Sequence, residues 1–379
     1  ALPIWAAFVT SGDVTNPLLT TADAAELTLQ GMIDKANAGD TITLNSNTEI
    51  AATLQITKNL TLDLNGYVLK MGGTGRVIHI TSSAEVEIKD GESNRAHTGE
   101  YAALPAGGVI TGGKAESGGG ILLDGGCTLK LTGGCITDCR ATDTGGGGVD
   151  LRGSTAILYI SGTARIENCT AGEVWGANAI FNSGTMYADG GTVDGTVNNQ
   201  GTIKHSNGVT DVTVFNEAVY NRAKKIIETG IYKGTVENRG SITGGTFYGG
   251  VTDDGGTIRG GTFAVTFDIG DGTKTEPTLV EYNNPVPERA APTKSGHTFT
   301  GWYLGEEKYN FDTPVTAPLT LTAKWEKVPS SGGYYYYPTT DTKADDAKGS
   351  PKTADPGIAL YAALSLLSLT GLTCTAKKR

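Results

Sequence analysis

Two neighbouring stretches of the sequence are copies of each other, "GGGILLDGGCTLKLTGGCITDCRA" at 118–141 and "GGGVDLRGSTAILYISGTARIENCTA" at 146–171. When they are aligned on their glycines, Ile121 corresponds to Val149, and "ITDCRA" corresponds to "IENCTA". The offset is 28 residues at the start and 30 at the end, so the second copy contains two extra residues. Apolar and polar residues alternate in short runs between glycines, and this pattern predicts β-strands joined by tight turns.

A second series of shorter repeats follows, in which an apolar residue precedes Asn or Asp and, in most copies, Gly. Its members are "AIFNSGTM", "TVNNQGTI", "TVFNEAVY", "TVENRGSI" and "GVTDDGGTI". Such periods, with many β-branched residues, predict a solenoid of stacked strands, because one coil cannot cover its own apolar side. We interpret the polar positions as a structural ladder at one corner of the coils, with ligand binding as the alternative. They are Asn182, Asn199, Asn216, Asn238 and Asp253, at spacings of 17, 17, 22 and 15 residues.

The segment "TADAAELTLQGMIDKANAGDTITL" at 21–44 predicts a short helix that runs into a strand, with Asp23 as its N-cap and Gly39 at its C-terminal end. A helix at this place would cover the open end of the solenoid. The helix, the "AGDTITL" turn and the alternating "NLTLDLNGYVL" together resemble the pectin-lyase-like family of right-handed parallel β-helices, over about residues 20–264. The resemblance implies a fold more than a function, because this fold hosts lyases, hydrolases and non-catalytic surface proteins.

The composition changes at Val265, after which prolines and aromatic residues become frequent. The motifs "GHTFTGWY", "YNFDTPV" and "LTLTAKW" in this part resemble the B repeat of internalin-type bacterial surface proteins. That resemblance implies a small β-grasp-like module. We expect Trp302, Tyr303 and Trp325 to fill its core, with contact to a partner as a secondary role.

The C-terminal region contains an uncharged segment, 356–376, followed at once by Lys377, Lys378 and Arg379. As a helix its 21 residues would measure about 31 Å, which matches a bilayer core of about 30 Å. Positive charge is retained on the cytoplasmic side, so the rest of the chain would lie outside the cell. We expect a transmembrane helix, with a buried C-terminal helix as the alternative.

Directly before that segment, "SPKTAD" resembles a Gram-positive sortase sorting signal, in which a Pro-x-Thr motif precedes a hydrophobic span and a basic tail. The resemblance implies that Pro351 and Thr353 are recognised, that Lys352 is the variable position, and that the bond from Thr353 to Ala354 is cut. Ser350 stands where the family has leucine, and Ala354 where it has glycine. The implied partners are a sortase, the cell-wall peptidoglycan and, before processing, the membrane.

The expected fold is therefore all-β, a right-handed parallel β-helix followed by a small β-grasp-like module, a polar stalk and a C-terminal transmembrane helix. The first segment is interpreted as N-terminal chain that could include the remnant of a signal peptide. The stalk lacks an apolar period. In chain order the five parts are 1–20 (N-terminal segment), 21–264 (β-helix with its capping helix), 265–327 (module), 328–349 (stalk) and 350–379 (sorting signal and membrane segment).

Composition argues against several classes of function. The net charge is −10, and Lys and Arg cluster only at the C-terminus, which argues against a nucleic-acid partner because such binding depends on cations that contact phosphates. The cysteines before the membrane segment form no C-x-x-C pair and have no histidine at a zinc-binding spacing, so we expect no metal and no cofactor. Cys139 and Cys169 occupy equivalent positions in the two copies, where either free thiols or a disulfide would fit.

Charged residues recur on what should be the outer side of the two copies. If Val149 and Leu151 point inward, Asp150 and Arg152 point outward, and the 28-residue offset stacks Asp124 on Arg152. We interpret Asp124, Asp150 and Arg152 as a surface polar cluster that contains a cross-strand ion pair. The alternative is a catalytic role, since lyases of this fold use clustered carboxylates with a basic residue. No catalytic residue is assigned.

The predicted function is that of a sortase-anchored surface protein, non-catalytic, that adheres to a glycan or a host protein through its β-helix. The alternative is a surface lyase or glycoside hydrolase acting on acidic polysaccharide. Five aromatic residues are candidates for an exposed adhesive face, although stacking within the core or a ladder is the preferred interpretation of each. They are Tyr187, Tyr232, Phe247, Tyr248 and Trp175.

Overall fold

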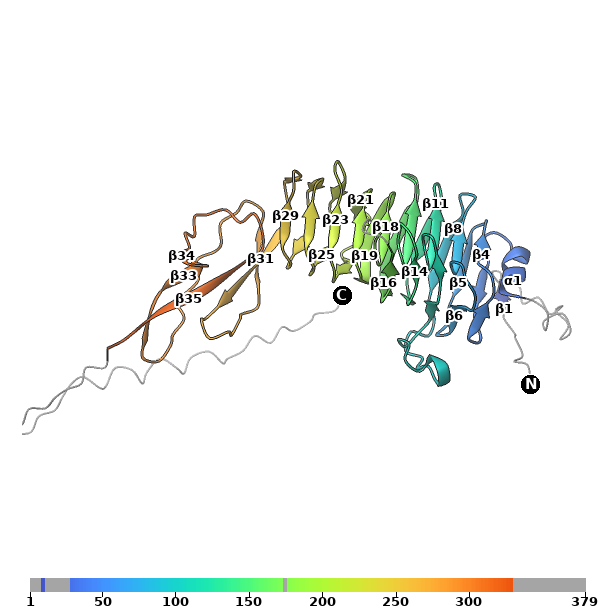
Figure 1. Ribbon diagram of the computed structural model, residues 1–379, viewed down its shortest axis with the longest axis horizontal. Coiled ribbons are helices and arrows are strands. Elements are labelled where there is room, and N and C mark those ends of the chain that lie inside the picture. The colour runs from blue at the N-terminus through green and yellow to red at the C-terminus, as the bar shows by residue number, and fades with distance from the viewer. Residues whose placement is uncertain (1–7, 11–27, 173–175, 330–379) are drawn as a thin grey trace, which may run out of the picture. The chain divides into compact units, whose positions relative to one another are not determined.

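The computed structural model describes residues 8–10, 28–172 and 176–329, which form an all-β structure with long parallel sheets (Figure 1). Successive strands of each sheet come from successive turns of the chain. The chain thus winds as a solenoid of stacked coils, the arrangement of a β-helix. Each coil passes over three faces in the same order, which we name the first, second and third face.

The first face consists of β2 (Thr41–Thr43), β5 (Leu60–Asp63), β8 (Glu85–Lys89), β12 (Thr128–Leu131), the start of β16 (Ile157–Glu167), the start of β19 (Thr185–Asp194), β21 (Thr202–Lys204), β24 (Ile226–Ile227), β27 (Ser241–Ile242) and β30 (Thr257–Ile258). The second face consists of β3 (Thr48–Ile50), β6 (Val68–Met71), β9 (Val109–Thr111), β13 (Cys135–Thr137), the ends of β16 and β19, β22 (Val214–Phe215), β25 (Ile231–Tyr232), β28 (Thr246–Phe247) and the start of β31 (Thr262–Asp268).

The third face is a sheet of nine strands, and short elements join the faces or flank them. The strands of the third face are β4 (Leu54–Ile56), β7 (Ile78–Ile80), β11 (Ile121–Asp124), β15 (Val149–Arg152), β18 (Ile180–Asn182), β20 (Val197–Asn199), β23 (Val219–Asn221), β26 (Val236–Asn238) and β29 (Val251–Asp253). The other elements are β1 (Phe8–Thr10), which pairs antiparallel with β2, the 3₁₀ helix Gly99–Tyr101, and a small sheet of β10 (Lys114–Ala115), β14 (Arg140–Ala141) and β17 (Thr170–Ala171).

The register predicted from the two long repeats is confirmed. Ile121 pairs with Val149 on the third face, an offset of 28 residues. Ile136 pairs with Ile166 on the second face, where the offset has grown to 30. The two extra residues of the second copy therefore enter between the faces, and the inward-facing residues stay aligned.

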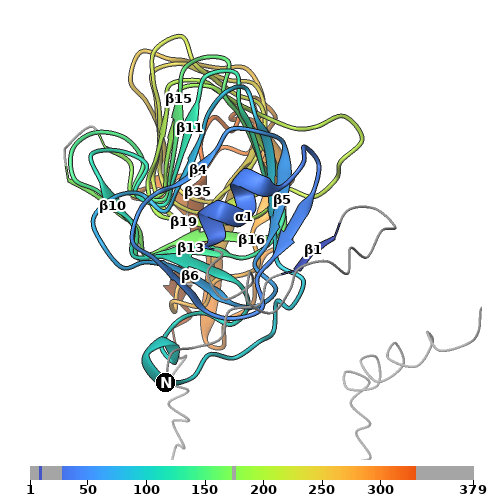
Figure 2. The same cartoon turned by 90° about the vertical axis from the view of Figure 1, so that its right-hand side faces the viewer.

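One α-helix, α1 (Leu29–Lys35), covers the open end of the first coils (Figure 2). Thr28 is its N-cap, because its Oγ1 accepts a hydrogen bond of 3.1 Å from the backbone N–H three residues on. The predicted N-cap, Asp23, lies outside the described residues, and the helix begins after it. The side chain of Gln30 donates to the backbone oxygen of Gln55 and accepts from its N–H, which pairs the edge of β4 that would otherwise be open.

The interior is filled by residues that repeat from coil to coil. Early coils stack aliphatic side chains such as Ile78, Ile121 and Val149, all fully buried. Later coils stack rings at centroid distances of 5.0 to 5.2 Å, and the rings face one another nearly in parallel. The stacked rings are those of Phe215, Tyr232, Phe247 and Phe263.

Buried asparagines line the corner between the third and first faces in the later coils. The side-chain amide of each donates to the side-chain oxygen of the next residue of the ladder, at 2.8 to 3.0 Å. Each amide also lies within hydrogen-bonding distance of a carbonyl at the start of the first-face strand of the following coil, so the ladder joins successive coils at this corner. The side-chain oxygens of Asn182, Asn199 and Asn238 accept from the backbone N–H two residues on, which holds the turn between the faces. Its members are Asn182, Asn199, Asn221, Asn238 and Asp253.

The ladder therefore contains Asn221 in place of the predicted Asn216. Asn216 follows β22 on the second face, where its backbone N–H bonds the carbonyl of Val193. Both asparagines stand in the same local pattern, "TVFNEA" and "AVYNRA", so the repeat signal alone does not separate the two faces. The corrected spacings are 17, 22, 17 and 15 residues.

After the last coil, β31 continues into a further group of strands. It pairs antiparallel with β32 (Thr278–Glu281) and parallel with β35 (Leu319–Lys327). β33 (His297–Leu304) pairs antiparallel with β35 and with the short β34 (Glu307–Lys308). The start of β31 belongs to the solenoid, so one strand serves both groups.

The core of this group contains two of its three predicted aromatic residues. Trp302 is 4% exposed and packs edge-on against Phe267. Trp325 is partly buried, and its Nε1 donates to a backbone carbonyl at 2.7 Å. Tyr303 lies on the other side of β33, beneath the ammonium group of Lys324. Its predicted core position is wrong, because consecutive residues of a strand point to opposite sides.

Several residues for which the sequence predicts a role lie outside the described part of the chain. Within the described part, no helix is long and apolar enough to span a membrane. The predicted residues concerned are Trp175, the sorting signal Ser350, Pro351, Lys352, Thr353 and Ala354, and the basic tail Lys377, Lys378 and Arg379.

Candidate functional site

Five polar side chains come together on the outer surface of the third face, in three successive coils. β7 carries His79, β11 carries Asp124, and β15 carries Asp150 and Arg152. Arg76 lies two residues before β7. We call these five residues the polar cluster. Alternate residues of each strand point into the core, which turns the cluster residues outward.

The predicted register of the cluster is present, but the described residues contain no ion pair between the two predicted partners. Asp124 stands opposite Arg152 in the parallel register. However, Nη2 of Arg152 donates to Oγ of Ser117 at 2.7 Å. Oδ2 of Asp124 instead lies 3.1 Å from Nε2 of His79. The expected pairing is replaced because a loop over the sheet brings another acceptor to Arg152.

Loops that leave the solenoid cover part of the cluster, and the one that carries β10 projects to the side of the coils in Figure 2. Gly145 belongs to a second such loop and has a φ of +96°. A Cβ on this residue would lie 2.6 Å from Oδ2 of Asp150 and 2.7 Å from Cβ of Ser117, so the close approach requires glycine. Asp150 is consequently only 5% exposed, although it points away from the core.

Burial changes the ionisation of two members of the cluster. Removal from water raises the pKa of the Asp150 carboxyl above its usual value, and the carboxylate of Asp124 raises it further. A hydrogen bond with Ser117 and the positive charges of Arg152 and Arg76 lower the pKa of Asp150 and so oppose this shift. The same loss of water lowers the pKa of Arg76, and the charge of Arg152 adds to the effect.

Arg76 also carries a polar atom that lacks a partner. Its Nε is buried and has no hydrogen-bond acceptor among the described residues. An unpaired buried donor costs free energy that an incoming acceptor would recover. The geometry of Arg76 thus favours the binding of an oxygen-rich ligand at this place.

The cluster could support two kinds of chemistry. The guanidinium groups of Arg76 and Arg152 can bind carboxylate or hydroxyl oxygens. A carboxyl whose pKa is raised by burial, such as that of Asp150, can hold a proton as general acids do. No group of three or more His, Cys, Asp or Glu side chains suited to a metal ion occurs in the ranges that the structure describes.

The sequence alone does not identify Arg76, His79 and Ser117 as members of the site. His79 faces Leu122 in the sheet, but 43 residues and a long loop separate the two, so no repeat offset aligns them. The alternation in "VIHI" does place His79 on the outside. Ser117 belongs to a loop, and periodicity says nothing about where a loop crosses a sheet.

The aromatic candidates for an exposed face occupy different places. Tyr232 and Phe247 belong to the buried ring stack. Tyr187 is half-buried on the first face and stacks on Tyr159 with centroids 4.4 Å apart. Tyr248 is 42% exposed. Stacking within a ladder is therefore the role of the first three.

Cys139 and Cys169 are free and buried, so the free-thiol alternative describes them. Their Sγ atoms donate to the carbonyl oxygens of Thr137 and Ile136. The neighbouring Cys139 thiol and burial both raise the pKa of Cys169, which keeps it protonated at neutral pH.

One part of the chain matches a known family. Residues 263–324, which hold β32, β33, β34 and most of β31 and β35, match the Listeria-Bacteroides repeat domain. Two relatives come from Evansella cellulosilytica, one provisionally named a Gly-rich membrane protein (37% identical over 68 residues) and one a membrane protein (36% over 67). The matches cover 17% of this chain but only 8% and 10% of those proteins. No solved structure matches the chain.

Proposed function

We propose that this protein is displayed on the surface of a Gram-positive bacterium and that its β-helix binds a glycan at the polar cluster. A host surface protein is the other class of partner that the sequence interpretation allows. The surface location is supported by the repeat domain, by the membrane-protein names of the two relatives, and by the predicted sorting signal.

We also propose the finer features of fold and anchoring that the sequence predicts. The solenoid is a right-handed, pectin-lyase-like β-helix, and the strands after it are an internalin-type B repeat with a β-grasp-like fold. A sortase cuts after Thr353 and joins the protein to peptidoglycan.

The binding proposal rests on the charged groups of the polar cluster and on their partial burial. Two arginines and two carboxylates are gathered on one face, partly sheltered by loops, and Nε of Arg76 is buried without a partner among the described residues. Asp150 is kept out of water without being part of the core. A sugar hydroxyl or carboxylate at this place would supply the missing acceptor.

The binding proposal is tested with full-length protein and oligomers of polygalacturonate, neutral glycans and matrix proteins, by calorimetric titration. Arg76→Gln should weaken binding of the preferred glycan at least tenfold, because hydrogen bonds to charged groups contribute about 1.5–3 kcal/mol. The matched control is Arg239→Gln, an arginine of the same face that is paired with Glu237 and Asp254 and should leave binding unchanged. Equal affinities of the native protein and Arg76→Gln would reject the cluster as the binding site.

A second function, cleavage of an acidic polysaccharide, is supported by Asp150. A buried carboxyl with a raised pKa beside the carboxylate of Asp124 resembles the acid and base pair of glycoside hydrolases. Incubation with polygalacturonate should then release new reducing ends, or unsaturated ends for a lyase, and Asp150→Asn should abolish the release. Tight binding with no product would leave adhesion as the function.

The anchoring part of the proposal has its own test. Thr353→Ala should move the protein from the covalent cell-wall fraction to the membrane fraction, since the acyl transfer requires the residue before the cut bond. Retention of the variant in sodium dodecyl sulfate-washed walls would reject the sorting signal.

A further inference from the structure

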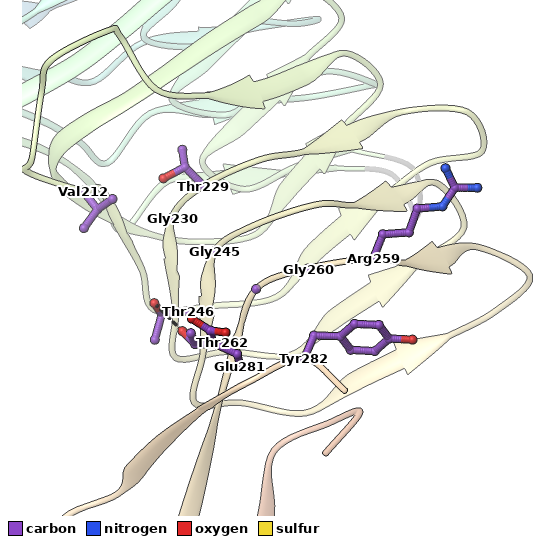
Figure 3. Close-up of a pocket in the computed structure, with 11 residues that line it drawn as sticks. Val212, Thr229, Gly230, Gly245, Thr246, Arg259, Gly260, Thr262, Glu281 and Tyr282 are labelled. Carbon is purple, nitrogen blue, oxygen red and sulfur yellow. Dashed lines mark hydrogen bonds between the residues drawn. The ribbon is translucent and has the colours of Figure 1, made fainter. Parts of the chain in front are cut away.

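A polar groove crosses the last coils of the solenoid, at the corner between the first and second faces (Figure 3). Its volume is about 470 Å³, and it is lined by residues of successive coils together with Glu281, at the end of β32, and Tyr282. The polar cluster lies on the third face of earlier coils. The two sites have no residue in common.

A repeated segment builds the groove, "SITGGTF" at 241–247 and "TIRGGTF" at 257–263. Gly245, Gly260 and Gly261 of this repeat line the groove together with Gly230, and we call these four glycines its floor. Gly245 and Gly261 have φ values of +104° and +101°, and a Cβ on them would lie 3.1 and 2.9 Å from ring atoms of the buried aromatic stack. The close approach of the rings and the positive φ values therefore require glycine at these positions of the groove lining.

The walls of the groove carry different groups. Oγ1 of Thr262 donates to Oγ1 of Thr246 at 3.0 Å. Figure 3 shows this threonine pair with Glu281 on one side of the floor, and the side chains of Arg259 and Tyr282 on the other. The groove thus offers hydroxyl, carboxylate and guanidinium groups and one aromatic ring around its glycines.

Two classes of ligand fit this lining poorly. The carbonyl oxygens of Gly230, Gly245 and Gly261 each accept a 2.8 Å hydrogen bond from the next coil or from Tyr282, and this disfavours strand addition by a peptide at these three carbonyls. A polyanion is also disfavoured, because the lining holds one cation and one anion. Neutral ligands rich in hydroxyl groups suit the remaining donors and acceptors.

We propose that this groove is a binding site for a neutral oligosaccharide, separate from the polar cluster. A sugar ring lies flat on the glycine floor, its hydroxyls bond Glu281, Arg259 and the threonine pair, and a second ring contacts Tyr282. Because Glu281 and Tyr282 belong to the Listeria-Bacteroides repeat segment, the site is completed by residues from both the solenoid and the repeat.

The test is calorimetric titration of the full-length protein with cellotetraose and maltotetraose, beside tetra-galacturonate and tetra-alanine. At least one neutral tetrasaccharide should bind saturably, and Arg259→Ala and Glu281→Ala should each weaken that binding at least tenfold. Thr257→Ala is the matched control, an exposed residue of the same coil outside the groove, and should bind like the native protein. Asp150→Asn, in the polar cluster, should also leave this affinity unchanged.

The proposal would be overturned if neither neutral tetrasaccharide bound saturably, or if Arg259→Ala and Glu281→Ala both kept the native affinity. It would also be overturned if these variants lost binding of tetra-alanine or tetra-galacturonate and not of the neutral tetrasaccharides. Thermal unfolding of each variant separates a lost contact from a lost fold. Loss of neutral-sugar binding in Asp150→Asn would assign that binding to the polar cluster and reject the groove.

Discussion

The early coils, up to β15, and the later coils, from β18 onward, have the same three faces but differ in where their polar residues lie. In the early coils the corner before the first face is apolar, with Leu123 stacked on Leu151, and polar residues gather outside. In the later coils the same corner holds buried asparagines such as Asn199 and Asn221, which bond one another.

The early and later coils also differ in length. Leu123 and Leu151 are 28 residues apart, whereas Asn221 and Asn238 are 17 apart. The longer coils use their additional residues for loops over the third face, and the shorter coils close with a tight turn that the ladder holds. A polar residue that recurs in each coil is satisfied by its own copies. A polar residue that does not recur needs another partner, which in the early coils is a loop or, as we propose, a ligand.

The largest expected effect concerns the ring stack of the later coils. Phe247→Ala should lower the free energy of unfolding by about 3–5 kcal/mol, because it leaves a cavity between two stacked rings. Tyr187→Ala, in the half-buried stack of the first face, should cost about 1 kcal/mol. Denaturant unfolding monitored by circular dichroism measures both. Equal losses would contradict the view that the later coils depend on the buried ring stack.

The second prediction compares two asparagines. Asn221→Ala should lower the free energy of unfolding by about 1–3 kcal/mol, because it removes two buried hydrogen bonds, one from the amide of Asn199 and one to the side-chain oxygen of Asn238. Asn216→Ala, outside the ladder, should cost less than about 0.5 kcal/mol. The same unfolding measurement decides the question. A larger loss from Asn216 than from Asn221 would restore the position expected from the repeats.

The smallest expected effect is a pH dependence in the early coils. Because its pKa is raised in the folded state, Asp150 binds its proton more tightly there, so the stability of the protein falls as pH rises from about 3.8 through the folded-state pKa. Asp150→Asn lacks this loss. The melting temperature of Asp150→Asn should therefore increase relative to the native protein from acidic to neutral pH.

The matched control for this pH profile is Asp143→Asn, an exposed carboxylate in the loop that also holds Gly145. Its melting temperature should follow that of the native protein over the same range. A constant difference between Asp150→Asn and the native protein at every pH would show that burial does not perturb this carboxyl.

The periodicity of the sequence correctly predicted the contacts that recur in every coil. The match of Ile121 with Val149 and the stacking of Tyr232 and Phe247 follow from burial that recurs in every coil. The error at Asn216 arose where two faces carry the same local pattern, and the error at Tyr303 where neighbouring aromatic residues point to opposite sides of one strand. In each case the residue type indicated the kind of interaction, but the sequence did not indicate on which face or side of the strand the residue lies.

The sequence by itself determined that this chain forms stacked β-strands, because alternation and glycine spacing are local properties that every coil repeats. Only the tertiary structure decided which polar groups meet. Ser117 reaches Arg152 through a loop, His79 reaches Asp124 across a long insertion, and Tyr282 completes a groove begun by glycines of another coil. These contacts join residues whose separations follow no period, so their energies depend on the path of the loops and not on the repeat.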